Sequence, residues 1–241
     1  MRYAPFIAKR LRAWKLGVPL GLSRNFRLPE TIRFQGRHER VHLPRETGTA
    51  VAFVELLFAD SYGLDNVPRP VRHVVDIGAN VGLFCLAARL AFPSAVIHAY
   101  EPNPQLEPYL RRQAEIAEAT YWMEAVGLES GTVSLEVHPD SVLTRSHPDQ
   151  KGSIPACAFH DVVNRIGGSV DLVKIDCEGA EWDLWEDHEA WSLVANVTGE
   201  YHLVGERTHD DARCMLSRLG FTVKNQMPSE DFGLIWATRA G

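Results

Sequence analysis

HVVDIGANVGLFCLAARLAF, residues 73–92, contains a short apolar run, a turn with two glycines and an apolar stretch at helical spacing. The first run is typical of a buried strand and the last of a helix. Between them, Gly78 and Gly82 permit a tight turn and the close approach of a ligand. We therefore expect a strand, a glycine turn and a helix that together open a βαβ unit.

Short apolar runs and amphipathic stretches go on alternating after this segment. Strands are expected at residues 73–78, 95–101, 120–126, 132–137, 170–176, 194–203, 221–226 and 233–238, and helices at 80–92, 104–118, 160–166, 181–191 and 210–220. This alternation predicts an α/β fold with a mainly parallel sheet. The last two strands are joined by MPSEDF (227–232) alone, a length that requires antiparallel pairing. The polar stretch 138–152 has the composition of a loop.

Residues 1–60 differ from the rest of the chain in pattern and in charge. They predict a basic helix at 2–16, a hairpin with strands at 31–34 and 40–43, and an apolar helix at 48–60. Residues 1–45 carry 11 Lys and Arg and 2 Asp and Glu, whereas residues 46–241 carry 14 and 29, so the net charge of −6 hides two unlike parts. We divide the chain into a basic N-terminal extension, 1–60, and a larger domain, 61–241.

The first predicted helix has an apolar face. Phe6, Ile7, Leu11 and Trp14 recur near helical spacing, with cations between them. Such a face has to be buried against something. We expect it to pack on the rest of the chain or to form a homo-oligomer; contact with anionic lipid and closure over a bound acceptor are alternatives.

The composition excludes several classes of protein. Hydrophobic residues make up 45% and charged residues 23%, which is ordinary for a globular protein. No stretch approaches the roughly 20 apolar residues of a membrane span. The four cysteines are far apart and match neither a zinc site nor a disulfide framework. Cations interrupt any leader-like run at the N-terminus, so the cytoplasm is the expected compartment.

Acidic and glycine residues around the first two strands predict a nucleoside site. Glu101 ends the second strand, where a carboxylate accepts from both hydroxyls of a ribose. Asp76, Gly78 and Gly82 belong to the preceding turn. Asn80 stands where a dinucleotide fingerprint has its second glycine, which points to a nucleoside without diphosphate, such as S-adenosylmethionine. The alternative is a plain glycine turn with an acid at a strand end.

Two later strand ends add further candidates. Asp176 ends a buried strand within KIDCEGAE (174–181) and faces the expected ligand crevice. For Glu178 and Glu181, an acidic cluster favoured by a helix N-terminus is an equal alternative. Glu200 and His202 share one face of the next strand and suit an oriented base or a pair of metal ligands. A satisfied core histidine is the alternative for His202.

The motifs together resemble a known family. VVDIGANVGLF, YEPNP, EAVGLESG, DLVKIDCEGAEWDLW, GEYH and LGF, within about residues 60–225, are similar to the FkbM family of S-adenosylmethionine-dependent methyltransferases. The resemblance implies a class I methyltransferase (Rossmann-like) fold, with a doubly wound sheet of seven strands and the last two antiparallel. It also implies methylation of a hydroxyl on a sugar or a polyketide-type natural product. Phe159-His160-Asp161 and Cys177 depart from the family pattern and leave the acceptor open.

The resemblance also implies roles for individual residues. It places Asp76, Gly78, Asn80 and Gly82 at the methionine portion of the cofactor, Glu101 and Asn103 at the ribose, Glu124 and Ala125 at the adenine, and Asp176 and Glu178 near the sulfonium. We expect His202 to be the general base, oriented by Glu200 and with Asp176 close by. A second route is a divalent cation, Mg²⁺ or Mn²⁺, held by Asp176, Glu200 and His202.

Other functions compete with this interpretation. An NAD-dependent oxidoreductase has similar architecture, but the glycine triplet is missing. An RNA methyltransferase would use the basic N-terminal extension, yet no Lys/Arg run with interleaved aromatic residues is present. A non-catalytic scaffold would not need acids and a histidine beyond the cofactor pocket. We therefore expect a small-molecule hydroxyl acceptor and no nucleic-acid partner.

Overall fold

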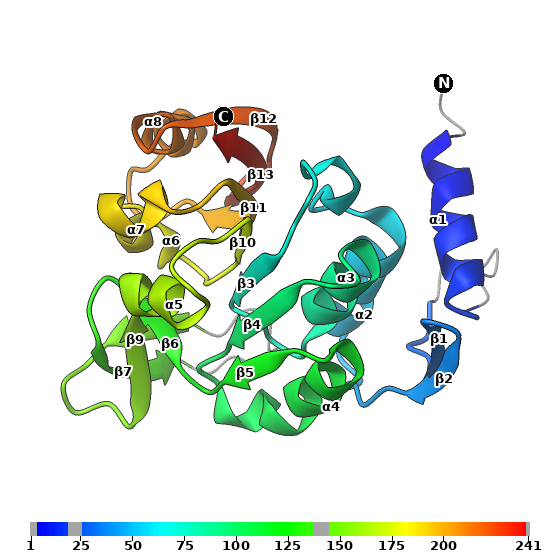
Figure 1. Cartoon of the computed structure of the whole chain (residues 1–241). Coiled ribbons are helices and arrows are strands. Elements are labelled where there is room, and N and C mark those ends of the chain that lie inside the picture. Colours follow the sequence, from blue (N-terminus) through cyan, green and yellow to red (C-terminus); the bar gives the residue numbers. More distant parts are fainter. Residues whose placement is uncertain (1–3, 19–25, 137–144, 240–241) are drawn as a thin grey trace.

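The computed structural model describes residues 4–18, 26–136 and 145–239 (Figure 1). Its centre is a seven-stranded sheet, in spatial order β12 (Phe221–Pro228), β13 (Phe232–Arg239), β11 (Asn196–His202), β10 (Leu172–Ile175), β3 (His73–Ile77), β4 (Val96–Tyr100) and β5 (Thr120–Trp122). Strands β11, β10, β3, β4 and β5 are parallel, and β13 is antiparallel to β11 and β12. The predicted sheet and its antiparallel end are confirmed.

Helices cover both faces of this sheet. Alternate residues of a strand face opposite sides: Val74 and Leu172 belong to one hydrophobic cluster, Val75 and Val173 to the other. The first cluster includes α3 (Leu83–Ala91), α4 (Glu107–Ala117) and the 3-10 turns η2 (Leu64–Asn66) and η3 (Pro104–Leu106). The second includes α5 (Phe159–Arg165), α6 (Glu181–Leu184), α7 (His188–Ser192) and α8 (His209–Arg218). Such a doubly wound sheet leaves its carboxyl edge for ligands.

A second sheet departs from the sequence prediction. It consists of β6 (Ala125–Gly127), β9 (Ile154–Ala158), β7 (Gly131–Glu136) and β8 (Arg145–Pro148). The predicted strand 120–126 is divided into β5 and β6, and part of the predicted loop 138–152 forms β8. Whether a segment forms a strand depends on the strands that it can pair with more than on its own residue types. The polar composition therefore predicted a loop, although β8 pairs with β7. Residues 137–144 lie outside the described part.

The N-terminal extension contains α1 (Ala4–Lys15), β1 (Thr31–Phe34), β2 (Arg37–Arg40), α2 (Thr47–Val54) and the π-helix η1 (Glu55–Ala59). The second hairpin strand was predicted at 40–43 but lies at 37–40, because Gln35 and Gly36 both adopt positive φ and form a two-residue turn. Phe53 and Phe58 share the first hydrophobic cluster with α3. No helix in the described part has the length and apolar composition that crossing a bilayer needs.

Gly199 in the middle of β11 offers a test of this arrangement. Its φ is 141°, and an added Cβ would lie 1.8 Å from the carbonyl oxygen of Ile175 on β10. Gly199→Ala should therefore lower the free energy of unfolding by about 3 kcal/mol or more in a urea titration. Gly131→Ala is the matched control, because nothing lies within 4 Å of its added Cβ. Equal stabilities of the two variants would contradict the pairing of β10 with β11.

Candidate active site

A cavity of about 840 Å³ opens at the carboxyl ends of β3, β4, β10 and β11. It is lined by most of the predicted site residues: Gly78, Asn80, Glu101, Glu124, Ala125, Asp176, Glu178, Glu200 and His202. A larger hollow of about 1350 Å³ lies between residues 26–50 and α4, but it contains none of them. The chemistry-bearing side chains therefore converge on the smaller cavity.

The turn after β3 brings two strand ends into contact. Gly78 has a φ of 74°, and an added Cβ would lie 1.8 Å from the carbonyl oxygen of Asp176. The amides of Gly78 and Ala79 donate to the carbonyl oxygen of Tyr100, 3.0 and 2.9 Å away. Only glycine permits this approach, so the turn lies directly against the end of β10.

Glu101 closes the same turn from β4. The side chain is buried, and its two oxygens accept from the backbone amides of Asn80 and Asn103, each at 2.8 Å. Burial raises the pKa of Glu101 to about 7, against the lowering effect of these two donors. Each oxygen keeps a further lone pair, so the carboxylate can still accept from a ligand that bears a diol.

Three predicted cofactor residues do not line the cavity, namely Asp76, Gly82 and Asn103. Strand alternation turns the Asp76 side chain toward α3, where Cys85 donates to it at 3.5 Å. Gly82, with a φ of 82°, precedes the first residue of α3. The Asn103 side chain accepts from the amide of Gln105 and caps η3. These residues shape the turns around the cavity.

Lys174 was missed by the sequence analysis, yet it connects the two strand ends. Its ammonium is 3.1 Å from Asp76 and 3.9 Å from Asp176, and it donates to the carbonyl oxygens of Ile77 and Gly78. Burial lowers the pKa of Lys174, but the carboxylates of Asp76 and Asp176 outweigh burial and the net shift is upward. The lysine therefore carries a charge inside the protein.

Tyr62 is a second residue that was missed. Its hydroxyl is 3.1 Å from Asp176 and 3.4 Å from Glu200, and its carbonyl oxygen accepts from Thr198 at 2.7 Å. The tyrosine follows η1 and so comes from a segment that carries no motif. Burial, and next the charge of Asp176, raise the pKa of Glu200 to about 8. Tyr62 therefore lies between two carboxylates that repel each other.

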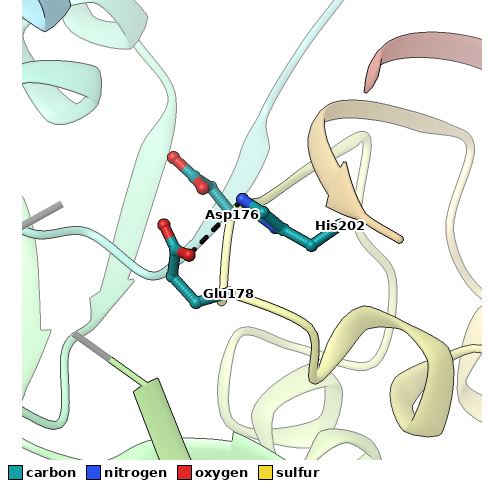
Figure 2. A group of neighbouring side chains, drawn as sticks. All are labelled: Asp176, Glu178 and His202. Atoms are coloured by element: carbon teal, nitrogen blue, oxygen red, sulfur yellow. Dashed lines mark ion pairs between the residues drawn. The ribbon is translucent and has the colours of Figure 1, made fainter. Parts of the chain in front are cut away.

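His202 is held between two carboxylates. Nδ1 lies 3.3 Å from Glu181. Nε2 lies 3.5 Å from Glu178, the ion pair that is dashed in Figure 2. Burial lowers the pKa of His202, but Glu181, Glu178 and Asp176 outweigh burial and raise it to about 9. Glu181 is fully buried and also accepts from the amides of Cys177 and Gly179. The orienting role was predicted for Glu200; in the structure Glu181 contacts the ring and Glu200 contacts Tyr62.

Asp176, Glu178 and His202 form the group among the described residues that has the spacing of a metal site. One potential ligand atom from each lies within 4.8 Å of the others, and the side chains point toward one another in Figure 2. The sequence analysis placed Glu200 in this set, whereas the structure has Glu178 there. Because Glu178 follows the end of β10, a single loop supplies both carboxylates.

Glu124, between β5 and β6, and Ala125, the first residue of β6, also line the cavity. Glu124 pairs with Arg165 at 3.0 Å, and Ala125 is buried. The guanidinium of Arg165 lies 4.8 Å from the centre of the Trp122 ring, which stacks on Tyr100 at 5.0 Å. Tyr100, Ala125 and Val126 line this part of the cavity, whereas Trp122 and Arg165 do not.

The chain is similar to several known proteins. Methyltransferase sdnD of Sordaria araneosa is 28% identical over 235 residues, covering 78% of this chain and 88% of that protein. The 31-O-demethyl-FK506 methyltransferase FkbM of Streptomyces tacrolimicus is 37% identical over 84 residues. This match covers 34% of this chain and 32% of the Streptomyces protein. A solved structure, precorrin-6y C5,15-methyltransferase of Geobacter metallireducens, covers 84% of this chain and 94% of its own, with 15% identity and a TM-score of 0.48.

A family model matches a longer continuous part of the chain than the FkbM relative does. The model of the methyltransferase FkbM domain matches residues 76–223, which is more than half of the chain. The match begins at Asp76 in β3 and continues past His202 at the end of β11, so it includes the acids and the histidine described above but not the cavity lining from α2, η1 and β13. The seven-stranded sheet with its antiparallel end is the class I methyltransferase fold that the resemblance implied. The chain therefore belongs to the methyltransferase FkbM domain family.

Proposed function

We propose that this chain is an S-adenosylmethionine-dependent O-methyltransferase that acts on a hydroxyl of a small molecule. One observation carries the proposal: a single cavity has the buried Glu101 at one end and the group around His202 at the other. The first end suits a ribose diol and the second suits proton removal. A cofactor and an acceptor bound end to end would place the reacting atoms between them.

The residues at the cofactor end fit S-adenosylmethionine. Glu101 would hold the ribose, and the turn at Gly78 and Asn80 would hold the methionine portion. The wall of Ala125 and Tyr100 suits an adenine ring. The acids of the cavity outnumber Lys174, and the resulting negative potential favours a ligand that carries a positive sulfonium.

The acceptor side favours a small apolar molecule over RNA. It is lined by apolar side chains from α2, η1 and β13: Val51, Ala52, Leu56, Phe232 and Leu234. Glu55 and Asp231 lie on the same side and would repel a phosphodiester. This lining supports an acceptor with a large apolar part, as in a polyketide-type natural product.

His202 is the residue that we assign to proton removal. S-adenosylmethionine supplies a methyl group that is already activated, so the protein has to position the acceptor and take up its proton. Nε2 of His202 lies 3.5 Å from Glu178, which lines the cavity together with the histidine, and Glu181 holds Nδ1. The neighbouring carboxylates stabilise the imidazolium and raise the pKa of His202 to about 9, so the histidine acts as the base in its deprotonated fraction, which grows as the pH rises toward 9.

A divalent cation is a second candidate for activating the hydroxyl. Asp176 and Glu178 offer carboxylate oxygens and His202 offers Nε2, a donor set that suits Mg²⁺ or Mn²⁺. One observation favours this route: Glu181 lies behind Nδ1, the arrangement that orients metal-binding histidines elsewhere. A cation there would lower the pKa of the hydroxyl directly.

The proposed activity is tested by binding first and by turnover second. Calorimetry should show S-adenosylmethionine and S-adenosylhomocysteine binding to the full chain. A mass-spectrometric screen of glycosides and polyketide-type compounds should then reveal a gain of about 14 daltons in at least one acceptor. If neither S-adenosylmethionine nor S-adenosylhomocysteine binds, the proposal is contradicted. If structured RNA is methylated and no small molecule is, the acceptor is RNA and not a small molecule.

The pKa of Glu101 yields a prediction on pH. The carboxylate accepts from ribose hydroxyls best when it is ionised, so affinity for S-adenosylmethionine should rise as the pH increases from 6 to 8, through the raised pKa of about 7. Glu101→Gln should weaken binding at pH 8 by about tenfold or more and remove most of the rise. Glu129→Gln, on an exposed side chain, is the control. A Gln variant that keeps the wild-type pH dependence would exclude this role.

The role assigned to His202 is tested by measuring turnover and cofactor affinity separately. His202→Gln should lower turnover by about 10²-fold or more and change cofactor affinity by less than about threefold. His188→Gln, at an exposed position, should leave both unchanged. Full turnover in His202→Gln would show that another group removes the proton. If EDTA abolishes the wild-type activity and Mn²⁺ restores it, the cation route applies instead.

A further inference from the structure

We propose that α1 docks this chain on a membrane surface that contains anionic lipids. The proposal does not depend on the reaction. It rests on how α1 is fixed to the protein, on which side chains this leaves outside, and on the charges around them. In Figure 1, α1 lies at the margin of the molecule, beside the β1–β2 hairpin.

One side of α1 is firmly attached to the protein. Ala13 and Leu16 are buried in the first hydrophobic cluster. Arg12 donates to the carbonyl oxygen of Phe58 at 3.1 Å and forms ion pairs with Asp60 and Asp65. The carbonyl oxygen of Leu16 accepts from the amide of Arg33 at 2.7 Å. These contacts fix the rotation of the helix about its axis.

The opposite side of α1 is an exposed apolar stripe. Ile7, Leu11 and Trp14 are exposed by 63%, 49% and 69%. Their spacing of four and three residues places them on one face along successive turns. Isolated exposed apolar side chains are ordinary, whereas three large ones on one helix face mark a binding surface. The expectation that this face packs on the rest of the chain is therefore wrong for these three residues.

The charges beside the stripe favour an anionic lipid surface as its partner. Arg10 is three residues from Ile7 and four from Trp14, and Lys15 is four residues from Leu11, so both exposed cations border the stripe. An Ile/Leu/Trp face flanked by cations is the pattern of helices that lie in a membrane interface. The hairpin beside α1 adds Arg33, Arg37 and Arg40, all exposed. A second copy of α1 would instead bring like charges together.

Docking by this face would also place the cavity close to lipid. The helix α1 contacts η1, and Glu55 and Leu56 of η1 line the cavity. The helices α1 and η1 then separate the stripe from the cavity wall, a distance of at most about two helix diameters, or about 20 Å. The sequence predicts the cytoplasm as the compartment of this protein, and the membrane leaflets that face the cytoplasm are rich in anionic lipids.

The experiment is flotation of the full chain with vesicles of phosphatidylcholine alone or mixed equally with phosphatidylglycerol. We expect binding to the mixed vesicles, little binding to phosphatidylcholine, and weaker binding as salt increases. The double variant Leu11→Ser/Trp14→Ser should lower the vesicle-bound fraction at least tenfold. The control, Leu193→Ser/Met227→Ser, removes two similarly exposed side chains from other elements and should bind like the wild type.

Further measurements distinguish a membrane from other partners. Arg10→Gln/Lys15→Gln should lower binding to the mixed vesicles, and circular dichroism should show that every variant keeps the wild-type fold. Absence of binding at low salt, or binding that the Leu11/Trp14 variant leaves unchanged, overturns the proposal. A wild-type dimer that becomes a monomer in Leu11→Ser/Trp14→Ser, measured by light scattering without lipid, overturns it too and assigns the stripe to a second copy.

Discussion

The candidate site depends on one buried cation. The ammonium of Lys174 reaches from β10 to Asp76 on β3 and to the carbonyl oxygens of the turn after β3. A buried charge of this kind is tolerated only while its partners are present, so the ion pair and the turn require each other. Gly78 then fits against the carbonyl oxygen of Asp176, where any side chain would collide. The cavity exists because these two strand ends are held so close.

Burial also explains why two acids of the site have raised pKa values. Glu101 and Glu200 have raised pKa values of about 7 and 8, chiefly because burial disfavours their charged forms. Lys174 alone does not neutralise the carboxylates around it. A cationic ligand would supply the missing positive charge and favour their ionised forms, so cofactor binding and proton release would be coupled. Such coupling suits a sulfonium ligand better than its neutral product.

The sequence predicts those parts of the site that follow from strand ends alone. Glu101 and Asp176 directly follow β4 and β10, and His202 ends β11, which are parallel strands of one sheet, so their convergence follows from the topology. Lys174 could not be predicted, because its role depends on the register that pairs it with Asp76. Tyr62 precedes the recognisable motifs and reaches the site only through tertiary packing. The second sheet was missed because its strands β8 and β9 lie within or beside a polar stretch.

In the N-terminal extension, hydrophobic periodicity alone did not predict which face of α1 is buried. Leu11 and Trp14 of α1 predicted the buried face, yet Ala13 and Leu16, which directly follows the helix, are buried instead. Arg12 decides between the two faces, because its ion pairs with Asp60 and Asp65 form only in this rotation. The residues before the matched family region therefore face two ways. Their inner side, from α2 to Tyr62, lines the proposed acceptor site, and their outer side carries the exposed stripe, so both features lie outside the region that the family model matches.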